Sequence, residues 1–320
     1  MASFGDLNRV NTNIQSLDSQ LSLNKINRDM ANNQLKMSTG LRINRAEDDA
    51  AGYSIGTKLK SRIGGLNQAL QNVGDAKSVL DIAESSFSTI MDNLVEMKGL
   101  STQAANDTLG DTERGYIADQ IKALGDDINE VANQTVFQDY ELLNGNGGGN
   151  TGSLSLTFQV GERSSDTITT NLKAVNVGSL FAGGTSTTQN LGATGATAGG
   201  GATTAIKATA ATASNQGALT FASTATSADF RSFIGSVDSA IDAMSDRVND
   251  IGITQSSLST REETLSQSIS ANESAKSRIM DTDFAKAQSE SVRLQILQQT
   301  STSAMAQANM GPQSVLGFLG

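Results

Sequence analysis

The feature that most constrains this chain is an apolar residue at every seventh position between residues 66 and 104. One row consists of Leu66, Val73, Leu80, Phe87 and Leu94. A second row, three residues further along, consists of Ala69, Ala76, Ala83, Ile90, Met97 and Ala104. Two such rows are typical of the buried a and d positions of a left-handed coiled coil. We therefore expect a helix of roughly 58 Å over these residues, at 1.5 Å per residue, packed lengthwise against other helices.

Similar spacing recurs in four other stretches. It predicts a helix over 117–131, after the typical helix start at 111–113, and another over 230–251. The apolar rows of the latter are Phe230, Ile234, Val237, Ile241, Met244, Val248 and Ile251. The chain ends carry Val10, Ile14, Leu17 and Leu21 on one side and Phe284, Ala287, Leu294, Leu297, Ala304 and Ala308 on the other. The expected fold class is mainly α, with long helices at both ends of the chain.

The middle of the chain has a different composition. A turn-rich stretch at 144–149 precedes residues 154–161, whose alternation of apolar and polar residues predicts a strand in a small β element. Residues 183–228 consist mostly of Gly, Ala, Ser and Thr, and Lys207 is their only charge. Such a segment buries little apolar surface, so it is either a flexible insert or a small, weak domain. Its Ser and Thr hydroxyls also offer positions for O-linked sugar.

Composition excludes several classes of function. The chain has no Cys and no His, which rules out thiolate nucleophiles, Ser-His-Asp triads and the usual zinc sites. We expect no enzyme activity, no cofactor and no metal site. The net charge of −10 argues against a nucleic-acid partner. No apolar run approaches the length of a transmembrane helix, and residues 1–10 lack the order of a cleaved secretory signal.

Two acidic clusters have structural explanations. Glu47, Asp48 and Asp49 lack the alternating ligand spacing and the Gly of a calcium loop, so a metal site is disfavoured. Asp281 and Asp283 are expected to cap the start of a helix.

Three stretches carry a resemblance to a known family. Residues 37–52, MSTGLRINRAEDDAAG, closely resemble the stretch LSTGLRINSAKDDAAG of bacterial flagellins. Residues 10–13, VNTN, resemble the family's INTN opening, and residues 306–316, AQANMGPQSVL, resemble its SQANQxPQxVL close. The resemblance covers about residues 8–145 and 229–320.

The resemblance implies a subunit of the flagellar filament built from three parts. Residues 1–45 and 278–320 would form an antiparallel coiled-coil core domain. Residues 46–177 and 229–277 would form a helical shaft with β-hairpins, and 178–228 a variable surface insert. It also implies an extracellular protein, exported by the flagellar type III route without a cleaved signal. Implied partners are other copies of the chain, an export chaperone, the filament cap and the hook-junction proteins.

The resemblance further assigns residues of the matched motif to the joint between core and shaft and its subunit contacts. These residues are Leu41, Arg42, Ile43, Asn44, Asp48 and Asp49. The alternative is that they form a plain helix-turn-helix corner. Apart from any family, the terminal apolar rows have no other core to pack against, so we expect Val10, Ile14, Leu17, Leu21, Leu294 and Leu297 to become buried on self-assembly. Repetition of one heterologous contact without closure gives a helical filament.

Other functions remain as alternatives at this point. A hook–filament junction protein of the same superfamily shares the terminal helices and acts as an adaptor present in few copies. An enzyme carried in the surface insert is disfavoured by the absence of His and by the single charge at 183–228. A generic extracellular coiled-coil adhesin would not polymerise. The family strip LQRVREL, which the innate immune flagellin receptor recognises, reads LVEMKGL at 94–100, so recognition by that receptor is expected to be weak or absent.

Overall fold

We describe the chain from a computed structural model, which defines residues 12–138, 140–145, 152–181, 189–191, 205–209, 211 and 216–316. The chain divides into two compact units. Unit 1 comprises Met1–Gly64 and Ser268–Gly320, and unit 2 comprises Gly65–Gln267. The boundaries between them fall inside two long helices, so each unit is described separately below.

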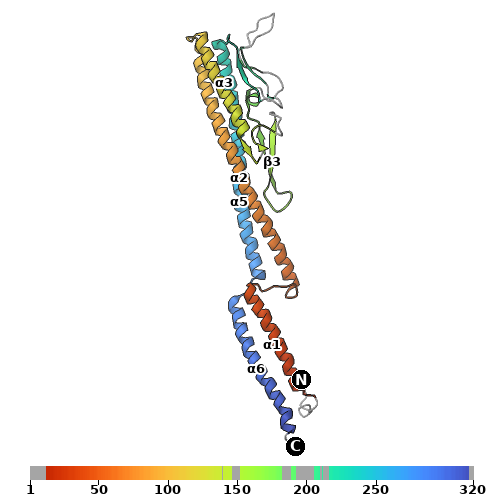
Figure 1. Cartoon of the computed structure of the whole chain (residues 1–320). Coiled ribbons are helices and arrows are strands. Elements are labelled where there is room, and N and C mark those ends of the chain that lie inside the picture. The colour runs from red at the N-terminus through yellow and green to blue at the C-terminus, as the bar shows by residue number, and fades with distance from the viewer. Residues whose placement is uncertain are drawn as a thin grey trace. The chain divides into compact units, whose positions relative to one another are not determined.

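Unit 1 contains a pair of helices from the two ends of the chain. Helix α1 spans Ile14–Thr39 and helix α6 spans Phe284–Leu316. Figure 1 shows them side by side. They run antiparallel, because Asn13 Nδ2 donates to the Ala308 carbonyl and Asn33 Nδ2 donates to the Ala287 carbonyl, each at 2.8 Å. A buried amide in such a pair fixes the register of the two helices. The expected antiparallel pairing of the chain ends is confirmed.

Unit 2 is built on three long helices, which Figure 1 shows lying along one another. These are α2 at Ala50–Ala104, α3 at Asp111–Gln134 and α5 at Ser227–Met280. Every residue of the two rows predicted between 66 and 104 is buried, and the most exposed of them retains only 6% of its surface. Ion pairs beside these rows join α2 to α5, with Lys77 Nζ 2.5 Å from Glu262 Oε2 and Lys98 Nζ 2.6 Å from Asp238 Oδ1.

Only one of the two rows predicted on α5 is buried. Phe230, Val237, Met244 and Ile251 are buried as expected, whereas Ile234, Ile241 and Val248 are only half-buried. The second buried row instead contains Phe233 and Ala240. Arg247 comes next at the same spacing, and burial lowers the pKa of its guanidinium to about 10. The side of α5 that faces inward is set by the residues packed against it, which a repeat alone does not specify.

An aromatic cluster shows what packs against that side of α5. The ring of Phe233 stacks on Phe181 at a centroid distance of 5.8 Å and meets Phe221 edge-on at 5.7 Å. Phe221 also stacks on Phe230, at 5.9 Å. Aromatic rings favour both arrangements at this separation. The cluster therefore attaches the segments around 181 and 221 to the start of α5.

Two short antiparallel hairpins follow α3. Strand β1 at Val136–Phe137 pairs with β2 at Tyr140–Glu141, and β3 at Ser153–Gln159 pairs with β4 at Thr167–Lys173. Burial alternates along β3 and β4, so one face of this hairpin points inward and the other is exposed. The strand predicted at 154–161 is confirmed as β3.

Several described residues of the low-complexity region are also packed. Helix α4 spans Val177–Phe181, just before this region. Within it, β5 at Gln189–Asn190, β6 at Ile206–Ala208 and β7 at Leu219–Phe221 form a sheet in the order β5-β6-β7. Ile206 and Leu219 are fully buried. A Cβ at Gly125 of α3 would lie 3.2 Å from Leu219 Cδ1, so the absence of a side chain lets β7 approach this helix closely.

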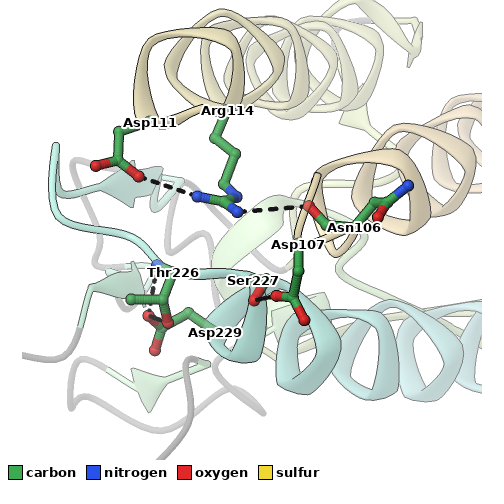
Figure 2. A network of polar contacts seen from close by, with 7 residues as sticks. All are labelled: Asn106, Asp107, Asp111, Arg114, Thr226, Ser227 and Asp229. Atoms are coloured by element: carbon green, nitrogen blue, oxygen red, sulfur yellow. Dashed lines mark hydrogen bonds and ion pairs between the residues drawn. The ribbon is translucent and has the colours of Figure 1, made fainter. Parts of the chain in front are cut away.

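A polar network holds the turn between α2 and α3 against the start of α5 (Figure 2). Asp107 accepts a hydrogen bond from the Ser227 hydroxyl and pairs with Arg231 at 2.9 Å. These two contacts hold the pKa of the Asp107 carboxyl below its usual value. Arg114 of α3 also contacts the turn, since its Nη2 donates to the Asn106 carbonyl at 3.4 Å. The network joins the turn to the first residues of both α3 and α5.

Candidate functional site at the joint of the terminal helices

Half of the candidate site residues lie where α1 ends, close to the end of α5 and the start of α6. We call residues 40–52 and 279–284, all of unit 1, the joint. Helix α1 stops at Gly40, whose φ of +71° is a left-handed conformation that glycine adopts without strain. Thr282 N then donates to the Gly40 carbonyl at 2.9 Å, and Leu41 forms a β-bridge with Asp281. The joint thus links segments about 240 residues apart in the sequence.

Arg42 contacts the carbonyls at the end of α5. Its backbone N–H donates to the Met280 carbonyl and its Nη2 donates to the Ile279 carbonyl, both at 2.6 Å. The last carbonyls of a helix have no partner within it and lie at the negative end of its dipole. A guanidinium is therefore a favourable group at this position, and Arg42 closes α5 by both main-chain and side-chain contacts.

Asn44 and Asp48 shape the turn that follows. Asn44 Nδ2 donates to the Leu41 carbonyl at 2.9 Å, while Asp48 Oδ2 accepts from the backbone N–H groups of Asn44 and Arg45, both at 3.0 Å. These two backbone hydrogen bonds, that of Arg45 first, hold the pKa of the Asp48 carboxyl below its usual value. The carboxylate form of Asp48 is therefore part of the turn.

Two further carboxylates at the joint cap helices. Asp49 precedes α2 and accepts from Gly52 N at 3.0 Å through Oδ1. Asp283 precedes α6 and accepts from Ala285 N at 2.9 Å. Both contacts are N-caps, so the cap predicted at Asp283 is confirmed, whereas Asp281 pairs with Leu41 in the β-bridge and has no cap contact to α6 among those described. Among the described residues, no group of three or more Asp, Glu, His or Cys is arranged to hold a metal ion.

Close packing inside the joint depends on glycine. Ile43 is buried, and a Cβ on Gly52 would lie 2.6 Å from Ile43 Cδ1. A Cβ on Gly56 would meet the side chain of Met280. The first turns of α2 therefore approach the turn and the end of α5 at a distance that no other residue type permits without a shift.

The terminal apolar residues lie along α1 and α6, outside the joint. Ile14, Leu17 and Leu21 are exposed at 39%, 52% and 65%, and Leu297 at 39%, whereas Leu294 is buried. Val10 lies outside the described residues. The structure adds Val292 and Ile296 of α6, exposed at 47% and 61%, to this set. Their spacing of four residues was a signal in the sequence, because it places both on one face of a helix.

Loss of the Asp48 carboxylate is expected to loosen the turn of the joint. Asp48→Ala should speed hydrogen exchange of the Asn44 and Arg45 amides by about fivefold, since a lost side-chain cap costs roughly 1 kcal/mol. Glu47→Ala, which removes only an exposed ion pair with Arg45, is the matched control and should change little. Hydrogen exchange of these amides is measured by mass spectrometry and corrected for intrinsic rates. Equal effects of the two variants would contradict the expected role of Asp48.

The same contacts predict a dependence on pH. The pKa of Asp48 is lower in the folded chain than in the unfolded one, so its ionisation stabilises the turn above about pH 4. That contribution is lost as the pH falls through the folded-state pKa. The difference between wild type and Asp48→Ala should therefore shrink as the pH is lowered below about 4.

Comparison with known proteins identifies the family of this chain. Family models described as "Bacterial flagellin N-terminal helical region" and "Bacterial flagellin C-terminal helical region" match residues 10–147 and 234–319. Flagellin of Bacillus subtilis (strain 168) is 32% identical over 97% of this chain and 99% of its own length. The flagellar filament 41 kDa core protein of Borreliella burgdorferi is 28% identical, over 91% of this chain and 93% of its own. A crystal structure of Bacillus cereus flagellin superposes with a TM-score of 0.41 at 21% identity, over 61% of this chain and 88% of that one. This chain belongs to the bacterial flagellin family and is a structural subunit of the flagellar filament.

Proposed function

We propose that the α1–α6 pair is the surface through which copies of this chain polymerise, and that the joint keeps this pair attached to α2 and α5. One observation carries the proposal. Apolar residues at helical spacing stay exposed on both helices, including Leu17 and Leu21 on α1 and Val292 and Ile296 on α6. Single exposed apolar residues are ordinary, but rows of them mark an interaction surface.

The geometry of a two-helix pair explains why these rows need another copy. Each helix buries one stripe against the other, where Asn33, Ala287 and Leu294 are buried, and within the described residues no third helix packs extensively against the pair. Covering the remaining apolar surface is favourable by about 25 cal/mol per Å². Neighbouring copies are the proposed cover for this surface, and repetition of one contact gives a helical filament.

The joint has a separate role in this proposal. Arg42, Asn44, Asp48 and Asp49 make their recorded contacts within the chain, to backbone groups. These contacts fix the joint before any neighbour is present. Its part in assembly is then to hold the terminal pair in a set geometry. Leu41 and the exposed polar groups around it are the proposed points of subunit contact, whereas Ile43 is buried and packs inside the joint.

The cellular route is also part of the proposal. The chain is proposed to leave the cell unfolded through the flagellar type III apparatus, without a cleaved signal, and to meet an export chaperone, the filament cap and the hook-junction proteins. The absence of Cys and the single Pro at 312 suit passage of an unfolded chain. In the described part of the chain, no helix combines the length and hydropathy needed to span a membrane.

Electron microscopy of the purified full-length chain after seeding with short filament fragments tests the proposed function. A matched variant that lacks residues 1–45 and 278–320 is run beside it. Filaments from the full-length chain alone are expected, because only that chain has the α1–α6 pair. Full-length chains that remain monomeric or form only short adaptors would contradict the proposal and favour the junction protein.

Weak recognition by the innate immune flagellin receptor is expected from the strip at 94–100. Glu96 and Gly99 are exposed on α2, where the family strip has Arg and Glu, and Lys98 is paired with Asp238. A charge of the wrong sign across an interface costs binding energy. Reporter cells should respond far less to this chain than to its double variant Glu96→Arg/Gly99→Glu. Equal responses to the two proteins would contradict the expectation.

A further inference from the structure

Three side-chain amides from separate segments of unit 2 form a closed cluster. Asn144 Nδ2 donates to Asn133 Oδ1 at 2.5 Å, and Gln216 Nε2 donates to Asn144 Oδ1 at 2.9 Å. Asn133 Nδ2 donates to Gln216 Oε1 at 2.9 Å, and Gln216 Nε2 also donates to Asn133 Oδ1. We call Asn133, Asn144 and Gln216 the amide cluster. It connects the end of α3, the loop after β2 and the segment that leads into β7.

Asn144 is the most constrained member of the amide cluster. Its side chain is buried, with only 2% of its surface exposed, and Nδ2 makes a second donation, to Glu141 Oε2 at 3.2 Å. Both hydrogens of Nδ2 are thus used, and Oδ1 is used as well. The adjoining backbone is also held, because Val175 N donates to the Leu143 carbonyl at 2.9 Å. The side chain cannot turn without breaking several buried hydrogen bonds.

Asn144 is followed by Gly145, and an Asn-Gly pair can react with itself through the side-chain amide. Gly145 has no Cβ to keep its backbone nitrogen away from the preceding side chain. Once deprotonated, that nitrogen can attack Asn144 Cγ. An N–Cγ bond then forms, the Cγ–Nδ2 bond breaks and ammonia leaves with the proton, which gives a five-membered succinimide. Water opens this ring to aspartate or isoaspartate.

We propose that Asn144 is a deamidation site that reacts in the unfolded chain and is protected by the amide cluster once unit 2 has folded. Attack by Gly145 requires Asn144 Cγ to rotate toward the Gly145 nitrogen, and the three hydrogen bonds of the amide oppose that rotation. Hydrolysis requires water at a buried position. Reaction in the native state is therefore limited to the fraction of molecules in which this region opens.

The reaction would also prevent the cluster from reforming. A carboxylate at 144 has no N–H to donate to Asn133 Oδ1 or to Glu141 Oε2. Its oxygens would lie beside those two oxygens, and none of them could donate a hydrogen bond. It would place a second negative charge beside that of Glu141. Isoaspartate would in addition lengthen the backbone by one methylene. A chain modified before folding is thus expected to lose the connection between α3 and the segment around Gln216.

Peptide mapping by mass spectrometry, with the full-length chain held in one alkaline buffer with and without urea, tests the proposal. Asn146–Gly147, the other Asn-Gly pair of the chain, lies outside the described residues and serves as the chemical reference in urea. In urea both pairs should deamidate at similar rates. Without urea Asn144 should react at least about a hundredfold more slowly than in urea, because it reacts only from opened molecules. Equal rates for Asn144 in the two conditions would overturn the proposal.

The variant Gln216→Ala tests whether the amide cluster is what protects Asn144 from deamidation. It removes the donor to Asn144 Oδ1 and should speed native-state deamidation of Asn144 by about tenfold, as expected for a lost buried hydrogen bond. Gln267→Ala, an exposed glutamine bonded within α5 to Glu263, is the control and should leave the rate unchanged. Circular dichroism establishes that both variants are folded. A folded Gln216→Ala chain that reacts at the wild-type rate would show that the cluster gives no protection.

Discussion

Filaments are expected to disappear when Leu17 and Leu21 of α1 are both replaced by glutamate. Both side chains are more than half exposed in the single chain and lie four residues apart on one face. Their burial on assembly would contribute roughly 1.5–3 kcal/mol each, and two carboxylates at the same place would add a desolvation cost. The concentration needed for polymerisation should rise by at least about a hundredfold, since each 1.4 kcal/mol is a factor of ten. This threshold concentration is measured by sedimentation of seeded samples.

A matched control separates loss of apolar contact from added charge on α1. Gln20→Glu adds a carboxylate at an exposed polar position of the same helix and is expected to change the polymerisation threshold far less. Both variants should keep the helical circular dichroism of the wild type, because the replaced side chains are outside the core. Normal filaments from the double variant would show that the exposed row of α1 is not a polymer contact.

Removal of the Phe233 ring is expected to destabilise unit 2 more than any surface change. Phe233 is fully buried and contacts both Phe181 and Phe221. Phe→Ala at such a site costs about 3–5 kcal/mol, from lost burial and the cavity left behind. For a unit of this size Phe233→Ala should lower the midpoint of thermal unfolding by about 10 °C.

Tyr116 provides the aromatic control for this prediction. It lies on α3 and is 67% exposed, so Tyr116→Ala should move the midpoint by no more than about 2 °C, as for most surface changes. Scanning calorimetry of the three proteins makes the comparison. A Phe233→Ala chain as stable as Tyr116→Ala would mean that the aromatic cluster does not anchor the segments around 181 and 221 to α5.

The long helices illustrate what a repeat can and cannot predict. On α2 both rows from Leu66 to Ala104 were found from spacing alone, because each position of the repeat carries an apolar residue. On α5 the spacing predicts one row correctly but assigns Ile234, instead of Phe233, to the second. Both residues are apolar and adjacent, and only the rings of Phe181 and Phe221 decide between them. Those partners come from a part of the chain with no heptad pattern.

The joint and the low-complexity region were harder to predict for different reasons. The motif at 37–52 located the joint by resemblance, yet nothing in the sequence indicates that Arg42 caps α5 at Ile279 and Met280. That contact joins segments far apart in the chain. In the low-complexity region the many Gly and Ala residues indicated weak packing, although the same small residues allow close approach, as at Gly217, where a Cβ would overlap the Thr209 carbonyl oxygen. Composition does not distinguish these two outcomes.

Burial of the exposed face of α1 between copies can be tested with one introduced thiol. The chain contains no Cys, so Leu21→Cys carries a single reactive group at the most exposed residue of the row. Its rate of reaction with a maleimide is measured in monomers, in filaments and in filaments returned to monomers. We expect a fast reaction in monomers, strong protection in filaments and recovery on dissociation. A thiol that reacts equally fast in filaments and in monomers would contradict it.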